Sequence, residues 1–300
     1  MSEETYYGGQ AVIEGVMIRG KKAMATACRL PNGEIRVVLE PVRSILARHR
    51  RLNIPFLRGT PALIDALSIG FRSMLLSADL ALEGEGKQPM NRLWFALSLA
   101  LALVLGIGLF VILPTLLTPK FHGGFIARAA ARAASPVVSN LIEGGIRLLV
   151  LVTYLAVISN LRDVKRIFEY HGAEHEVVNA YEHGRPLSEA AQFSTVHKRC
   201  GTAFIAVFIV VGVVVHAFLK WPVWHLRILY RIATVPVIAG IAFEIIKAAG
   251  KSHESWWYTL IGWPGLLLQR ITTRKPSADQ IEVAARAMES VLEAEGAAAP

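Results

Sequence analysis

Cysteine is scarce in this chain: only Cys28 and Cys200 occur among its 300 residues. Two thiols in such different sequence contexts do not form the disulfide framework on which small secreted domains depend. Reduced thiols in or facing the cytoplasm are the simpler interpretation. The first ten residues, MSEETYYGGQ, lack both a basic segment and an apolar core, so we expect no signal peptide.

Charged residues are also few. They make up 18% of the chain against 53% hydrophobic residues, and the mean hydropathy is +0.43, whereas an average soluble domain has about 25% charged residues. Part of the chain is therefore expected to face lipid. The net charge of +9 is not accompanied by a stripe of basic residues interleaved with aromatics. We predict no nucleic-acid partner and assign the basic excess to membrane topology and contact with anionic lipid.

Residues 1–55 have the pattern of a small soluble β-rich unit. Short apolar runs alternate with glycines, and the pair Asn32-Gly33 separates two such runs, which favours a β-hairpin. Glu14 lies between two glycines; it is either a site residue or part of a tight turn, and glycines in strands more often mark turns and bulges. Residues 56–92 then predict amphipathic helices followed by a linker, because their apolar face is interrupted by Asp65, Arg72 and Asp79.

Four apolar stretches predict membrane-spanning helices within residues 93–247. Leu93–Leu113 has no charge over its whole length, and about 20 apolar residues at about 1.5 Å each cross a bilayer. The fourth stretch is unusual because Arg231, Pro236 and Glu244 interrupt it, and ionisable residues in a span must face protein or water. The other three expected spans are Ile146–Leu161, Ala203–Leu219 and Ile228–Ile246. The first of these is expected to start about a turn before Ile146, with the Arg147 side chain reaching the membrane surface.

The orientation follows from where lysine and arginine gather. Basic residues are numerous before the first span, between the second and third, and after the fourth, and they are few in the other two connections. The positive-inside rule then predicts four spans with both termini cytoplasmic, in a bacterial inner membrane. The fold class expected is thus a mostly α, polytopic membrane protein with a small β-rich N-terminal cytoplasmic unit and amphipathic or interfacial helices.

The polar, histidine-rich segment 163–202 lies between two expected spans. Its centre is His171-Gly-Ala-Glu174-His175. On a helix the two histidines are one turn apart on one face, which is the commonest way for a helix to offer two zinc ligands, with a glutamate beside them. The alternative is an ordinary solvated helix face, since histidine clusters also occur without metal.

A third ligand must come from elsewhere in the chain. Glu244 lies near the cytoplasmic end of the fourth expected span, at the same membrane face as the histidines, so we predict one divalent metal, zinc by ligand type, held by His171, His175 and Glu244. His197 is the reserve third ligand. Glu174 is the expected general base that deprotonates a metal-bound water.

Four further residues are expected around this site: Asn179, Cys200, Glu176 and Glu14. Cys200 forms a His-x-x-Cys pair with His197, yet a cysteine at the start of a span is also a common small apolar residue. Residues 248–300 complete the chain. They predict an interfacial or re-entrant element rich in tryptophan and then a soluble amphipathic helix over Ser277–Glu295.

Four motifs resemble the YqhQ-like family of bacterial membrane proteins, and the resemblance covers nearly the whole chain. The resemblance implies a family of poorly defined function that has been described as a predicted metal-dependent enzyme. The chain departs from the family pattern at Glu176 and Lys198, where that pattern has lysine and proline. The four motifs are GGQAVIEGVM at 8–17, YHGAEH at 170–175, HKRCGT at 197–202 and PGLLLQRITT at 264–273.

Two functions of different classes fit these observations. One is a membrane-embedded, metal-dependent hydrolase at the cytoplasmic face that acts on a lipid-linked or membrane-protein substrate. The other is a non-catalytic regulator or scaffold in which the histidine cluster binds a structural metal or none. An open coordination position distinguishes a catalytic zinc from a structural one.

Overall fold

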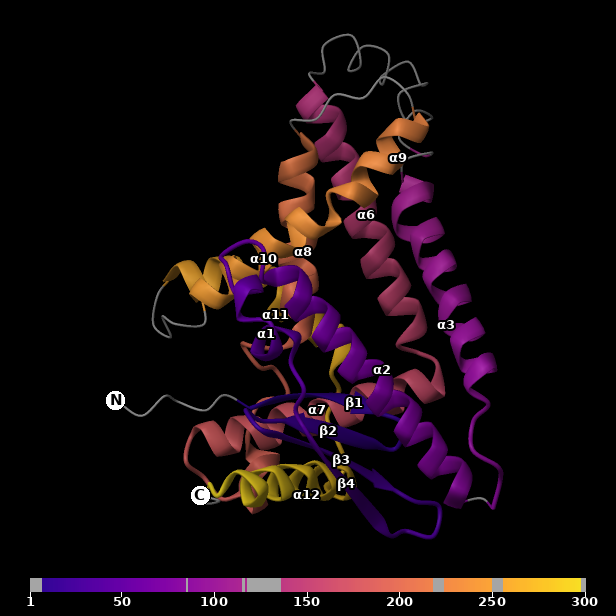
Figure 1. Cartoon of the computed structure of the whole chain (residues 1–300), viewed down its shortest axis with the longest axis vertical. Coiled ribbons are helices and arrows are strands. Elements are labelled where there is room, and N and C mark those ends of the chain that lie inside the picture. Colours follow the sequence, from indigo (N-terminus) through magenta and orange to yellow (C-terminus); the bar gives the residue numbers. More distant parts are fainter. Residues whose placement is uncertain are drawn as a thin grey trace.

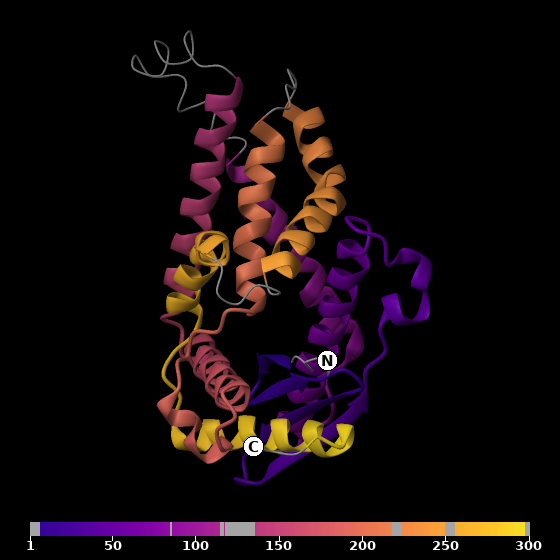
Figure 2. The same ribbon diagram turned by 90° about the vertical axis from the view of Figure 1, so that its left-hand side faces the viewer.

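The computed structural model describes residues 7–84, 86–114, 117, 136–217, 224–249 and 256–297. The chain is mostly helical, with one small antiparallel sheet at its N-terminal end (Figure 1). The long helices α3, α6 and α8 form one end of the molecule, while the sheet, α7 and α12 form the other (Figures 1 and 2).

The strands are β1 (Gly8–Val12), β2 (Gly15–Arg19), β3 (Ala23–Arg29) and β4 (Ile35–Pro41), paired in sequence order. The helices are α1 (Ile45–Arg48), η1 (Arg50–Leu52), α2 (Gly59–Gly84), α3 (Arg92–Ile107) with η2 (Gly108–Ile112), α6 (Pro136–Ile158), α7 (Arg162–Glu182), η3 (Leu187–Gln192), α8 (Gly201–Ala217), α9 (Trp224–Ala233), α10 (Val235–Ala249), α11 (Trp256–Thr272) and α12 (Ala278–Glu295).

The sheet lies between two layers of helix. Strand side chains alternate between faces, so Val16 and Ile18 pack with α7 and α12, while Met17, between them, packs with α2. The predicted hairpin is present: β3 and β4 are joined by a tight turn in which Gly33 has a φ of +89°, a conformation that favours glycine. The sheet is therefore the middle layer of the compact end of the molecule.

The C-terminal helix α12 closes this core. The Ser277 side chain accepts from the Gln280 N–H, and the Gln280 side chain accepts from the Ser277 N–H, which is a complete capping box. Gly296, with a φ of +68°, ends the helix in the left-handed conformation. Of the six residues that the sequence pattern places on its apolar side, four are buried (Ala284, Met288, Val291 and Leu292), whereas Ile281 and Ala285 are half-buried. The buried apolar residues of this face are Val283, Ala284, Ala287, Met288, Val291 and Leu292.

Within the described residues, three helices are long and apolar enough to cross a membrane: Arg92–Ile112, Asn140–Ile158 and Ile228–Ala248. The stretch expected as the third span forms α8, of which 17 residues are described; its expected end at Leu219 lies outside the described residues. The second span begins earlier in the sequence than predicted. The fourth is divided into α9 and α10, which meet at Thr234, two residues before Pro236, where a proline removes a helix hydrogen bond.

Charged side chains are buried between α6 and α9. Both oxygens of Glu143 are bonded by the guanidinium of Arg231, and Arg147, one turn along α6, donates to Glu143 at 3.0 Å. Glu143 is 1% exposed and Arg231 6%. Arg147 therefore turns inward to a carboxylate, whereas the sequence suggested that it reached the membrane surface. This group, which we name the α6–α9 charge cluster, consists of Glu143, Arg147 and Arg231.

Candidate metal centre

Helix α7 presents the two histidines of the YHGAEH motif on one face. Because they are four residues apart on a helix, His171 and His175 are neighbours, and their ring centroids are 4.4 Å apart. His175 is 1% exposed. The geometry expected from the sequence for these two residues is thus present.

Each imidazole is oriented by a backbone carbonyl. His171 Nδ1 lies 2.8 Å from the carbonyl oxygen of Thr272, and His175 Nδ1 lies 2.6 Å from that of Thr195. A carbonyl can only accept, so both rings carry their proton on Nδ1 and leave a lone pair on Nε2. Metal-binding histidines are commonly fixed in this way, with the second nitrogen donating to a backbone oxygen.

Cys200 completes a group of three possible ligands. Its sulfur lies 3.2 Å from His171 Nε2, and ligand atoms of His171, His175 and Cys200 all lie within 4.8 Å of one another. Cys200 directly precedes helix α8, so its position is set by the start of that helix. Two imidazole nitrogens and a thiolate are a ligand set that suits zinc. We call these three residues the His/Cys cluster.

The second ring nitrogen of His175, Nε2, accepts no hydrogen bond from the described part of the chain. Its Nε2 is buried and lacks a hydrogen-bond partner, although buried polar atoms are nearly always satisfied. Burial lowers the pKa of His175, and the nearby Cys200 opposes this change only in part. The ring is therefore held neutral, which is the form that binds a metal.

Gly172 explains how α7 reaches the carbonyl that orients His171. A Cβ atom at Gly172 would lie 2.0 Å from the backbone oxygen of Arg274, so only glycine permits this approach. The Arg274 N–H donates to the Phe168 carbonyl at 2.9 Å. The chain after α11 thus runs directly along α7 and brings the Thr272 carbonyl to His171.

Glu174, the expected general base, is buried beside the cluster. It is 5% exposed, and one of its carboxylate oxygens has no partner among the described residues. Burial raises its pKa, while the neighbouring imidazoles of His171 and His197 and the N–H of Gly9 act to lower it. The carboxylate therefore faces the histidines and the start of β1.

His197, the reserve ligand, has other partners. Its Nε2 lies 3.2 Å from Glu182, and its ring centroid is 5.6 Å from that of His175. Its backbone is fixed by Gln269 of α11, which accepts from the His197 N–H at 2.8 Å and donates to its carbonyl at 3.0 Å. His197 thus lies next to the cluster as an anchor for the loop that carries Cys200.

Glu244 is not brought to the histidines, contrary to the expectation from topology. Both of its oxygens are bonded by the guanidinium of Arg58, at 2.6 and 2.5 Å, and one accepts from the Phe56 N–H. A bidentate pair of this kind occupies the carboxylate. Cys200 therefore replaces Glu244 as the third candidate ligand.

The other residues expected near the site have structural partners. Asn179 donates to the carbonyls of Ser194 and Val196 and so holds the loop that supplies the Thr195 oxygen. Glu176 accepts from Lys275 at 2.7 Å. Glu14, with a φ of +52° in the turn between β1 and β2, forms an ion pair with Arg166.

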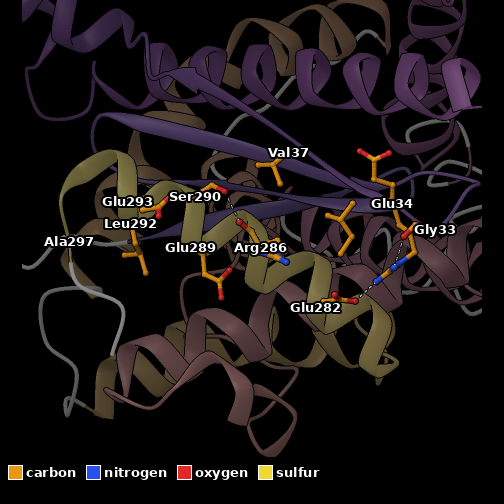
Figure 3. A pocket seen from close by; sticks show the side chains of 12 residues that line it. Gly33, Glu34, Val37, Glu282, Arg286, Glu289, Ser290, Leu292, Glu293 and Ala297 are labelled. Atoms are coloured by element: carbon orange, nitrogen blue, oxygen red, sulfur yellow. Dashed lines mark hydrogen bonds and ion pairs between the residues drawn. The ribbon is translucent and has the colours of Figure 1, made fainter.

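A polar cavity of about 760 Å³ lies away from this site, between the β3–β4 hairpin and α12 (Figure 3). Arg29 forms an ion pair with Glu282 there at 2.6 Å. Neither histidine nor cysteine is among its described lining residues. Its lining therefore differs in chemistry from that of the His/Cys cluster.

Sequence reasoning undervalued Cys200 and missed the carbonyls of Thr195 and Thr272 and the side chain of Gln269. The His-x-x-Cys spacing was a signal for Cys200. Backbone carbonyls leave no signal in residue identity, because every residue has one. Gln269 belongs to the PGLLLQRITT motif, and its position directly after an apolar run is the feature of the sequence that could have identified it.

The comparisons with known proteins agree with the family resemblance. A family model described as a protein of unknown function, DUF1385, matches residues 54–294. The chain is 35% identical over 305 aligned residues to the uncharacterized protein YqhQ of Bacillus subtilis (strain 168), with 96% of this chain and 93% of that protein covered. No solved structure matches the chain significantly. The chain thus belongs to the YqhQ-like DUF1385 family.

Proposed function

We propose that this protein is a zinc-dependent hydrolase of the bacterial inner membrane, with its site at the cytoplasmic face and a lipid-linked or membrane-protein substrate. The observation that carries the proposal is the buried Nε2 of His175. Among the described residues that atom has no hydrogen-bond partner, its ring is fixed through Nδ1, and a second imidazole and a thiol lie next to it. A metal ion is the simplest group that satisfies all three atoms at once.

His171, His175 and Cys200 would hold the ion. Three protein ligands are typical of catalytic zinc, which keeps a fourth position for water or substrate. When bound, zinc lowers the pKa of its water to about 7 and polarises a substrate carbonyl. The chain supplies the rest: Thr195 and Thr272 fix the two imidazoles, and Glu174 is the nearby carboxylate that can accept a proton from the attacking water.

The membrane setting is supported by composition. Three helices have the length and apolarity of spans, and we propose that α8 is a fourth, which keeps both termini on the cytoplasmic side. The His/Cys cluster lies where α7, the start of α8 and the end of α11 meet, and α7 belongs to the compact end while α8 belongs to the long helices (Figure 1). A site at that level is accessible to substrates embedded in the membrane.

One contact favours a second candidate, a thiol nucleophile activated by histidine. His171 Nε2 lies 3.2 Å from the Cys200 sulfur, with Nδ1 held by Thr272, and a base oriented by a third group is the usual arrangement for such a dyad. A dyad leaves the buried Nε2 of His175 unsatisfied, whereas a metal satisfies it. We therefore place the metal first.

Metal analysis of the purified protein tests the proposal. The wild type should contain about one zinc per chain, and His171→Ala, His175→Ala and Cys200→Ala should each lose it, because a three-ligand site does not tolerate loss of a ligand. A folded, metal-free wild type that complements a deletion strain would refute the metal and leave the thiol dyad or a scaffold. Zinc bound without Cys200 would also contradict the ligand set.

Glu174→Gln separates a catalytic site from a structural one. The change keeps the size of the side chain and removes its basic oxygen, so metal content should be unchanged while complementation is lost. Glu169→Gln is the matched control: it changes a carboxylate on the same helix that accepts from Gln280, and it should complement. If Glu174→Gln complements fully while His171→Ala fails, the metal is structural and the protein is a scaffold.

A further inference from the structure

A cavity of about 550 Å³ opens beside the His/Cys cluster, within the roughly 300–1,000 Å³ range of ligand pockets. His171, Cys200 and Thr202 form its polar end. The rest of its wall comes mostly from one face of α2, the first turns of α8, and Phe243 of α10. The other lining residues are Gly9, Gln10, Ala11, Gly59, Ala62, Leu63, Ala66, Leu67, Ile167, Phe168, Gly201, Phe204, Ile205 and Phe243.

The wall on the α2 side is one continuous helix face. Gly59, Ala62, Leu63, Ala66 and Leu67 recur at the three- and four-residue spacing that places side chains together. Ala62 and Ala66 are small, so α2 leaves room where larger side chains would fill the space, whereas Gly59 lets α10 approach closely, since a Cβ atom there would lie 2.7 Å from Gly240 Cα. The result is a channel with an apolar wall that ends at potential metal ligands.

The cavity borders surface that is apolar and exposed. Leu67 is 49% exposed and Ile205 48%, and both line the cavity. Ile205 belongs to the apolar helix α8, and Phe243 to the candidate span Ile228–Ala248. The cavity is therefore continuous with the helix surfaces that would face lipid.

The chemistry of the wall favours a hydrocarbon chain over a peptide. A peptide brings an N–H and a C=O for every residue, and each such group buried without a partner costs about 1–3 kcal/mol. Gln10, which has the longest polar side chain of the lining, already donates to the Gly70 carbonyl at 3.0 Å. A hydrocarbon chain makes no such demand and gains from the burial of its surface.

We infer that the cavity binds the acyl chain of a membrane phospholipid, with the polar linkage of that lipid next to His171 and Cys200. The inference deepens the proposed function by naming a lipid as the substrate class. Binding of the chain itself needs only the apolar wall. The two ideas therefore make separate predictions.

Photo-crosslinking of the full-length protein tests the inference. The probe is phosphatidylglycerol with a diazirine on one acyl chain, in phosphatidylcholine vesicles that contain the reconstituted protein. Wild type should crosslink at Leu63, Ile205 and Phe243, in addition to the lipid-facing surface of α3. Ala66→Trp, which fills the cavity, should reduce the cavity crosslinks about tenfold, equivalent to about 1.4 kcal/mol of binding.

Ala100→Trp on α3 is the matched control, since it adds the same side chain at an exposed position. It should leave the cavity crosslinks unchanged, and unchanged zinc content in Ala66→Trp would show that the variant is folded. Crosslinks confined to α3 in the wild type would overturn the inference. So would cavity labelling by a diazirine-bearing apolar peptide but not by the lipid, which would assign the cavity to a protein substrate.

His175→Ala separates failure of this inference from failure of the proposed function. It should lose zinc and keep the cavity crosslinks, because it does not line the cavity. Cavity crosslinks in a wild type without metal would support lipid binding and refute the hydrolase. A wild type with zinc and without cavity crosslinks would refute lipid binding in the cavity and leave the proposed hydrolase in place.

Discussion

Two buried polar groups in the described part of the chain, the α6–α9 charge cluster and the His/Cys cluster, differ in how their atoms are satisfied. In the charge cluster both oxygens of Glu143 are bonded by Arg231. In the His/Cys cluster the Nε2 of His175 has no partner. A buried ionisable residue is thus a poor sign of function by itself. A more informative sign is a side chain that is held in one orientation and has a buried polar atom without a hydrogen-bond partner.

The largest effect should come from breaking the charge cluster. Glu143→Ala leaves Arg147 and Arg231 without their shared carboxylate, and removal of one partner from a buried ion pair costs about 3–5 kcal/mol. Equilibrium unfolding in mixed micelles should show this loss. The double variant Glu143→Met with Arg231→Met should recover much of it, because apolar replacements of a buried pair are often neutral. An unfolding midpoint unchanged in Glu143→Ala would contradict the structural role.

Zinc should stabilise the protein through the other cluster. Free zinc at about 100 times its Kd adds about 2.7 kcal/mol to the free energy of unfolding of a protein that binds it only when folded. His175→Ala should show no such gain, so the difference in stability between it and the wild type should be larger with zinc than in a chelating buffer. Equal zinc stabilisation of the two proteins would exclude His175 as a ligand.

Asn179 should act on the metal through the loop that it holds. Asn179→Leu removes the bonds to Ser194 and Val196 and loosens the Thr195 carbonyl, and loss of such outer contacts weakens metal binding about 10-fold or more. Competition with a chelator measures this change. Asn160→Leu is the control, because the Asn160 side chain, in the turn after α6, donates to the Ala156 carbonyl of that helix, and zinc affinity should be unchanged in it.

The smallest effect on the metal is expected at Glu244. Its carboxylate is occupied by Arg58, so Glu244→Gln should keep full zinc content. Zinc content measured in parallel for Glu244→Gln and His171→Ala gives the comparison directly. Loss of zinc in Glu244→Gln would restore this residue as the third ligand and displace Cys200.

Local patterns predicted much of the fold. The Asn32-Gly33 turn, the face of α12 and the one-turn spacing of His171 and His175 all depend on residues close in sequence, and all are present. Where the prediction depended on distant residues it was weaker. Topology predicted only that Glu244 and the histidines share a membrane face, but a face is many ångströms wide, and pairing with Arg58 depends on how α2 packs against α10.

The site itself was only partly predictable for the same reason. Residue types and spacing identified two of the three candidate ligands. The choice of Cys200 depended on where α8 begins, and the orientation of the histidines depended on carbonyls from 195 and 272. These contacts join residues up to 101 positions apart along the chain. Sequence spacing carries no information on such distances.

The hydrogen bonds of Gln269 and Thr272 also have a consequence for biosynthesis. They fix the His197 backbone and the His171 ring, yet they belong to the last part of the chain to be synthesised. A nascent chain that ends before residue 269 has all three candidate ligands but neither clamp. On the proposed function, capture of the metal would therefore wait until residues 269–272 have left the ribosome and α11 has docked, and acquisition of the ion would report that the membrane domain is complete.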